Sequence, residues 1–157
     1  MAMSSRVIEQ AIAARSAATI LRRLRHIDKD DLLTAMATGL RTGVDEILAA
    51  NRADLDRGRE AGMDDALLDR LTLTPERIEG MAVGLEEVAR LDDPVGEVVR
   101  GWCTPLGVKV EQVRVPIGVI GIIYEARPNV TSDAAGICLK SGNACLLRGS
   151  SSALESN

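Results

Sequence analysis

The chain has 157 residues, of which 46% are hydrophobic and 27% charged, and its formal net charge at pH 7 is −4. This length favours a single domain, and the absence of Phe makes its core aliphatic and rich in alanine. No basic stripe or aromatic platform is present, so nucleic acid is not expected as a partner. No apolar run approaches the roughly 18 residues of a membrane span, so no membrane partner is expected either.

The histidine and cysteine content excludes further kinds of site. With His26 as the single histidine and no carboxylate–cysteine cluster, the sequence predicts no metal site and no Ser-His triad. The three cysteines are an odd number, and no signal peptide precedes them. Both observations favour a reducing compartment, so we expect a cytoplasmic location.

Residues 1–96 have the pattern of a helical region. Apolar residues that recur three or four positions apart predict a row of helices whose stripes form the core. Asp28 or Asp30 is expected to cap the second of them. Pro75 suits the first position of the last helix, which should end before Asp92. The expected helices cover residues 5–24, the stripe from Leu33 to Ile47, then 51–60, 64–71 and the segment that Pro75 begins.

Residues 97–115 predict a β-hairpin. Two β-branched segments, 97–103 and 108–115, flank the turn-forming sequence Pro105-Leu106-Gly107.

Residues 116–157 predict the start of a parallel sheet. The apolar run 117–124 indicates a strand that is buried on both faces. Thr131 or Ser132 can cap a helix that ends near Lys140, because Gly142 supplies the C-terminal stop. A second apolar strand follows at 144–148. In such strand–helix–strand units ligands bind at the carboxyl ends of the strands, so we expect the site there.

Four segments carry a resemblance to a known family. They are RVPIGVIG at 114–121, YEARPNVT at 124–131, LKSGNA at 139–144 and LRGS at 147–150. In these segments the chain resembles the gamma-glutamyl phosphate reductase family of the aldehyde dehydrogenase superfamily. The resemblance implies an α/β fold in which N-terminal helices lead into a Rossmann-like cofactor-binding domain of the aldehyde dehydrogenase type. That domain would be incomplete in this chain, and the catalytic domain would be absent.

The resemblance also implies an activity. Members of the family reduce L-glutamyl 5-phosphate to L-glutamate 5-semialdehyde with NADPH and release phosphate, a step of proline biosynthesis. Their nucleophilic cysteine lies in a later segment, and none of Cys103, Cys138 or Cys145 matches its motif. The chain as given is therefore expected to be inactive alone, and the full-length protein is expected to be a homo-oligomer.

Five residues match positions that the resemblance makes functional. Asn129 is expected to stabilise the oxyanion of the reaction, and Arg127 to bind the substrate's phosphate or carboxylate. Arg148, Gly149 and Ser150 are expected to hold the adenosine side of the cofactor, and an arginine there favours NADP over NAD. The plainer alternatives are that Asn129 only shapes the turn after Pro128, and that 148–150 is a loop with a capping serine.

Two other functions remain open from the sequence. The chain would fit the reductase half of a bifunctional pyrroline-carboxylate synthase, but its start at Met1 leads us to expect a reductase without a kinase domain. It would also fit a non-catalytic module that binds cofactor or pairs with other subunits.

Overall fold

The computed structural model describes residues 2–157, with side chains from residue 6 onward. Helices come first and two small sheets follow, which confirms the predicted α/β class. The elements are α1 (Ala2–Leu21), α2 (His26–Thr42), α3 (Val44–Glu60), α4 (Asp65–Leu71), α5 (Pro75–Arg90), β1 (Val98–Cys103), β2 (Lys109–Val113), β3 (Val119–Ile123), α6 (Asn129–Lys140), β4 (Ala144–Arg148) and the short 3₁₀ helix η1 (Ser151–Ala153).

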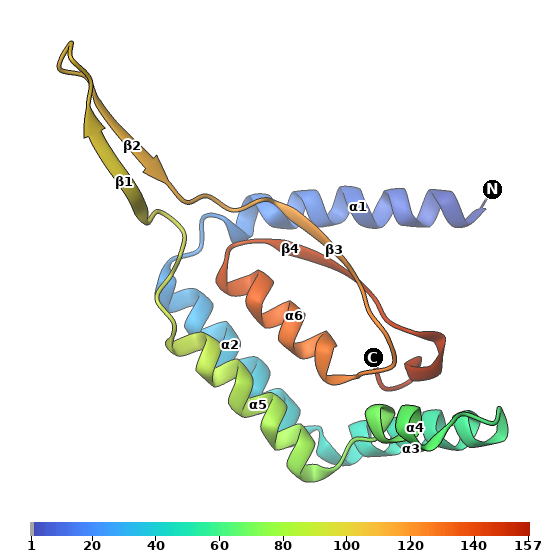
Figure 1. The fold of residues 1–157 in the computed structure, drawn as a ribbon. Helices are drawn as coiled ribbons and strands as arrows, with labels where there is room; N and C mark the ends of the chain where they lie inside the picture. Colours follow the sequence, from blue (N-terminus) through green and yellow to red (C-terminus); the bar gives the residue numbers. More distant parts are fainter. Residues whose placement is uncertain (1) are drawn as a thin grey trace.

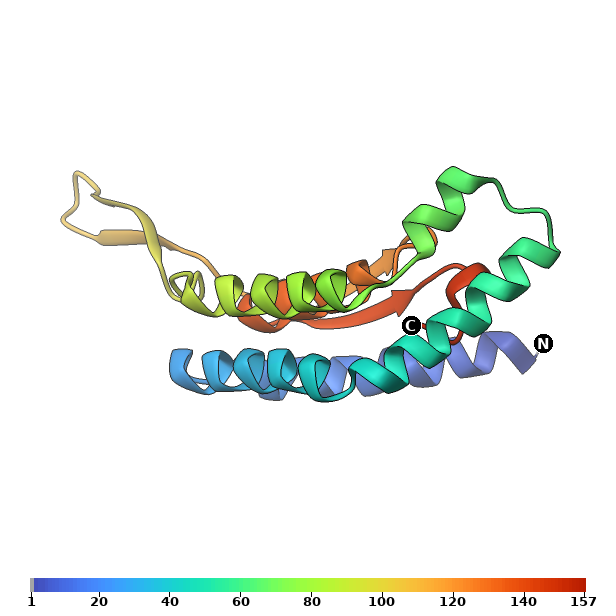
Figure 2. The same ribbon diagram turned by 90° about the horizontal axis from the view of Figure 1, so that it is seen from below.

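The elements form layers around the parallel pair β3–β4. Helix α1 lies on one side of this pair, and α6 lies on the other side, between the strands and the helices α2 and α5 (Figure 1). Helices α3 and α4 lie beside the C-terminal end of the chain, as Figures 1 and 2 both show. No helix among residues 2–157 has the length and hydropathy that crossing a membrane would need.

The centre of the helical layer is the contact between α2 and α5. Leu33, Ala37, Ala82 and Leu85 are buried there, so the predicted apolar stripes do form the core. Met36, Leu40, Val88, Ala89 and Leu139 pack around this cluster.

Two boundaries near α2 differ from the sequence prediction. Helix α2 begins at His26, before both predicted caps, because the Asp28 carboxylate accepts a hydrogen bond from the Arg25 backbone N–H at 3.1 Å and closes the first turn from inside. The stripe that was expected to continue to Ile47 is divided at Gly43, after which α3 runs unbroken from Val44 to Glu60.

Helix α6 also begins earlier than predicted. Pro128 occupies the N-cap with helical backbone angles (φ −58°, ψ −31°), so Asn129 is the first helical residue and neither Thr131 nor Ser132 is the cap. Ser132 instead donates its hydroxyl to the Asn129 carbonyl at 2.8 Å. This places Asn129 at the N-terminus of a helix rather than in a free turn.

The sheets meet the predictions only in part. Strands β1 and β2 form the expected antiparallel hairpin, which projects from the body of the chain (Figure 1). Strands β3 and β4 are parallel, with Val119 opposite Ala144 and Ile123 opposite Arg148. The prediction that the first of these is buried on both faces is wrong. Only β4 pairs with β3 among the described residues, and 78% of Ile123 is exposed.

Two buried lysines fasten the N-terminal end of α2 to distant segments. Lys29 is fully buried and donates to both Asp93 oxygens, at 2.7 and 3.0 Å. Lys140 at the end of α6 donates to Asp30 at 2.6 Å and to the Ala89 carbonyl at 2.8 Å. Burial penalises the ionised Asp93 carboxylate, but hydrogen bonds from Lys29 and the Val95 backbone outweigh this and hold the pKa of Asp93 below its ordinary value.

Helix α6 approaches α5 closely at Gly136. A Cβ atom at this position would lie 2.5 Å from Cδ2 of Leu85 and 3.4 Å from Cδ2 of Leu33. Both leucines are fully buried, so neither can move aside cheaply.

We predict that Gly136→Ala destabilises the chain by about 1–3 kcal/mol, because the added methyl group overpacks the core between α5 and α6. Gly39→Ala in α2 is the matched control, since a Cβ there would meet nothing within 4 Å. The control should be neutral or stabilising by up to about 1 kcal/mol. Urea denaturation of both variants measures the difference, and equal midpoints would contradict the prediction.

We predict that Asp93→Asn destabilises the chain by about 3–5 kcal/mol near neutral pH, because it leaves the buried Lys29 ammonium without a counter-charge. The folded-state pKa of Asp93 lies below the unfolded value, so the pair stabilises the fold above that value and is lost as the pH falls through the folded pKa. Denaturation at about pH 7 and about pH 3 should therefore show the deficit of the variant shrinking in acid. Asp56→Asn, on the exposed pair with Arg59, should cost little at either pH. A deficit that is the same at both pH values would contradict the prediction.

Candidate functional site

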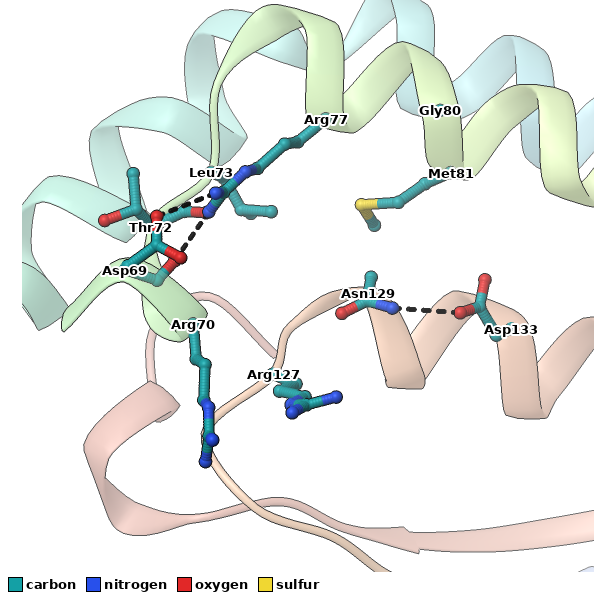
Figure 3. Close-up of a pocket in the computed structure, with 10 residues that line it drawn as sticks. All are labelled: Asp69, Arg70, Thr72, Leu73, Arg77, Gly80, Met81, Arg127, Asn129 and Asp133. Carbon is teal, nitrogen blue, oxygen red and sulfur yellow. Dashed lines mark hydrogen bonds and ion pairs between the residues drawn. The ribbon is translucent and has the colours of Figure 1, made fainter. Parts of the chain in front are cut away.

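A cavity of about 370 Å³ lies between the α4–α5 connection and the first turns of α6 (Figure 3). Arg127 and Asn129, both predicted from the sequence, lie on one wall of it. Met81 and Gly80 of α5 lie on another. The structure thus brings the two predicted substrate-side residues together, at the carboxyl end of β3.

The side chain of Asn129 is oriented by a neighbour one turn along α6. Its Nδ2 donates to Oδ2 of Asp133 at 3.1 Å (Figure 3). A carboxylate can only accept, so this bond fixes which end of the amide carries the donor. An amide nitrogen has two hydrogens, and the second remains available to a ligand.

Arg77 of α5 builds the opposite wall of the cavity. It donates to the carbonyl oxygens of Asp69 and Thr72, at 2.5 and 2.7 Å, and pairs with the Asp69 carboxylate at 2.8 Å. These hydrogen bonds from Arg77 hold the end of α4 against the start of α5. We therefore assign Arg77 a structural role.

The same connection is fixed from α3 by a buried amide. Asn51 is 1% exposed. Its Oδ1 accepts from the Leu73 backbone at 2.8 Å, and its Nδ2 donates to the Leu71 carbonyl at 2.9 Å and to the Ser156 hydroxyl at 3.0 Å. One side chain therefore joins the wall of the cavity to the C-terminal turn.

Asp54, one turn further along α3, holds that C-terminal turn. It is fully buried and accepts from the backbone N–H groups of Glu155 and Ser156, at 3.1 and 2.8 Å, and from the Ser156 hydroxyl at 2.6 Å. The Arg57 guanidinium also donates to it. The carboxylate charge is thus satisfied within the fold.

The predicted cofactor residues lie apart from this cavity, at the end of β4. Arg148 is exposed, and no side-chain partner of its guanidinium is found among the described residues. Ser150 accepts from the Ser152 backbone at 3.2 Å and caps η1, as the plainer alternative required. At Gly149 a Cβ atom would lie 2.3 Å from Nδ2 of Asn157, so only glycine fits without a shift.

The three cysteines are free and none lines the cavity. Burial, with smaller contributions from Cys145, raises the pKa of the Cys138 thiol to about 11, which makes it a poor nucleophile. Cys103 is exposed at the end of β1 in the projecting hairpin. No group of His, Cys, Asp or Glu side chains that could hold a metal ion occurs in the described part of the chain.

Sequence reasoning missed four charged residues of the cavity: Asp69, Arg70, Arg77 and Asp133. The first three belong to α4 and α5, far upstream of the motif that carries Arg127 and Asn129. Asp133 does carry a local signal, because a residue four positions after Asn129 on a helix lies on the same face.

The chain is similar to known proteins over its whole length. No family model matches it. It is 91% identical over all 157 residues to gamma-glutamyl phosphate reductase of Cutibacterium acnes, and 53% identical over the same span to that of Halothermothrix orenii. It covers 38% of the length of each of these relatives.

A solved structure has the same fold. In the crystal structure of gamma-glutamyl phosphate reductase from Thermotoga maritima, 36% of the chain superposes on 96% of this one with a TM-score of 0.92 and 46% identity. The chain therefore has the α/β fold of part of that solved structure. The chain belongs to the gamma-glutamyl phosphate reductase family and spans little more than a third of its relatives' length.

Proposed function

We propose that the chain is part of an enzyme that reduces L-glutamyl 5-phosphate to L-glutamate 5-semialdehyde in proline biosynthesis. The observation that carries the proposal is the 91% identity, over the whole chain, to a protein named gamma-glutamyl phosphate reductase. In the balanced reaction, one NADPH and one proton are consumed for each acyl phosphate, and NADP⁺, the semialdehyde and inorganic phosphate are released.

In this reaction the side-chain amide of Asn129 donates a hydrogen bond to the oxyanion. Attack on the acyl phosphate places negative charge on the carbonyl oxygen, and a preoriented neutral amide stabilises charge that appears only during reaction. The bond to Asp133 supplies that orientation, while the free hydrogen of Nδ2 meets the oxygen. The thiol nucleophile would come from the portion of the relatives that this chain does not span, so the 157 residues alone should not turn over.

The end of β4 fits the adenosine side of NADP. Arg148 has an uncommitted guanidinium beside three consecutive serines, and a 2′-phosphate suits such donors. Gly149 adds no side chain of its own at this strand end, which favours close approach of the cofactor to the backbone. When bound, NADPH supplies the hydride. We therefore propose that the substrate binds at the end of β3 and the cofactor at the end of β4.

The projecting hairpin supports a proposal about assembly. Val98, Trp102, Leu106 and Val113 are exposed on it, from 42% to 92%. A two-stranded ribbon is barely stable by itself in water, so this apolar surface favours burial against a second copy in a homo-oligomer. The free thiols agree with a reducing compartment, and we place the enzyme in the cytoplasm.

We predict that Asn129→Ala, in a full-length reductase that carries this sequence, lowers kcat by about 10²–10³-fold, since one oxyanion donor is lost. The affinity for NADPH should barely change, because the proposed cofactor residues lie at the end of the other strand. Steady-state kinetics, cofactor titration and thermal denaturation on the same preparation measure these effects.

The alternative assignment gives a different pattern for this variant. If Asn129 only shapes the start of α6, the melting temperature should fall while the folded fraction keeps a near-normal kcat. That result would remove Asn129 from the catalytic machinery.

A further inference from the structure

The cavity of Figure 3 holds charges of both signs that lack strong partners within the protein. The Arg127 guanidinium has no hydrogen bond or ion pair among the described residues. Arg70 reaches from α4 toward the loop that carries Arg127, and its one ion pair is with the exposed Glu125, at 3.9 Å. Arg77, by contrast, already makes three hydrogen bonds to Asp69 and Thr72. Arg127 keeps all of its donors for a ligand, and Arg70 keeps most of its donors because its contact with Glu125 is long.

The third uncommitted charge is negative. Asp133 is half-buried on α6, and Oδ2 accepts only from the neutral amide of Asn129. No cation pairs with this carboxylate among the residues that the structure describes. Asp69, the other carboxylate of the cavity, is already neutralised by Arg77 at 2.8 Å. A half-buried charge without a partner costs free energy, which a ligand cation would recover.

This combination of charges favours a dipolar ligand over a simple anion. A site for an anion alone would gain nothing from a carboxylate that faces it. An α-amino acid carries an ammonium group and a carboxylate on one carbon, so it matches one acidic wall and one basic wall. A volume of about 370 Å³ is within the range that small-molecule sites occupy.

We propose that the cavity binds the α-amino-acid end of the substrate. Asp133 pairs with the α-ammonium group, and Arg127 with Arg70 binds the α-carboxylate. Asp133 then determines specificity as well as positioning Asn129. This inference rests on the proposed function, because it presumes that the acyl group reacts beside Asn129.

The variant Asp133→Asn separates the two parts of Asp133. The new amide oxygen can still accept from Asn129, while the negative charge is removed. The matched control is Asp56→Asn on α3, which removes an exposed carboxylate paired with Arg59, away from the cavity.

The first experiment measures binding of three probes, by NMR titration, to a full-length reductase that carries this sequence. L-Norvaline has the full amino-acid end, pentanoate lacks the ammonium group and butylamine lacks the carboxylate. We expect norvaline to bind about tenfold more tightly than either of the others, the size of one charge-assisted hydrogen bond. Asp133→Asn should reduce the affinity for norvaline to that for pentanoate and leave the affinity for pentanoate unchanged. The Asp56→Asn control should change neither affinity.

The variants Arg127→Gln and Arg70→Gln should weaken the binding of norvaline and pentanoate, which carry a carboxylate, but not the binding of butylamine. If the unaltered protein bound norvaline and pentanoate with equal affinity, the inference would be overturned, whatever the variants showed.

The second experiment uses the full-length reductase in the reverse direction, with NADP⁺ and phosphate. The open-chain form of L-glutamate 5-semialdehyde, whose amine cyclises reversibly onto the aldehyde, is compared with 5-oxopentanoate, which lacks the amino group. We expect a KM about tenfold lower for the former, and Asp133→Asn should abolish that difference in KM. Equal KM values in an active enzyme would overturn the inference and leave the proposed function standing. Absence of turnover with both aldehydes would overturn the proposed function itself.

Discussion

The fold around the cavity depends on one buried polar face of helix α3. Asn51 and Asp54 lie three positions apart, so they point to the same side of the helix. Between them they bind the α4–α5 connection and the C-terminal turn. Both side chains are buried, which makes loss of any one bond costly. The wall of the cavity in Figure 3 and the segment after the proposed cofactor residues are thus fixed to a common support. A displacement of either one should therefore displace the other.

How much of the fold the sequence predicts depends on where the governing interactions lie. The apolar stripes of α2 and α5 predict their contact correctly, because helical spacing alone decides which side chains meet. The ends of the helices were less predictable. The start of α2 depends on a side chain inside its first turn, and that of α6 on Pro128 adopting helical angles. The burial of β3 was overestimated, because an apolar composition shows that a strand would be stable in a buried position but does not show which neighbours cover it.

The candidate site was predictable on one side only. Arg127 and Asn129 stand in a continuous motif, so a single stretch of sequence carries them. Arg70 reaches the same cavity from a helix that is distant in sequence, and the ion pairs of Lys29 and Lys140 join positions 64 and 110 apart. No local pattern marks such pairs, since they form only when the layers assemble.

The glycine at position 136 has a consequence for the shape of the candidate cavity. Asn129, Asp133 and Gly136 fall at i, i+4 and i+7 and therefore share one face of α6. The spacing between α5 and α6 is close at Gly136, opposite Leu85, and residues of the same two helices line the cavity nearer the start of α6. Paired changes of side-chain size at positions 85 and 136 would therefore widen or narrow the cavity of Figure 3 while the residues that line it stay the same. The shape of the cavity can thus be altered by substitutions in the core of this fold.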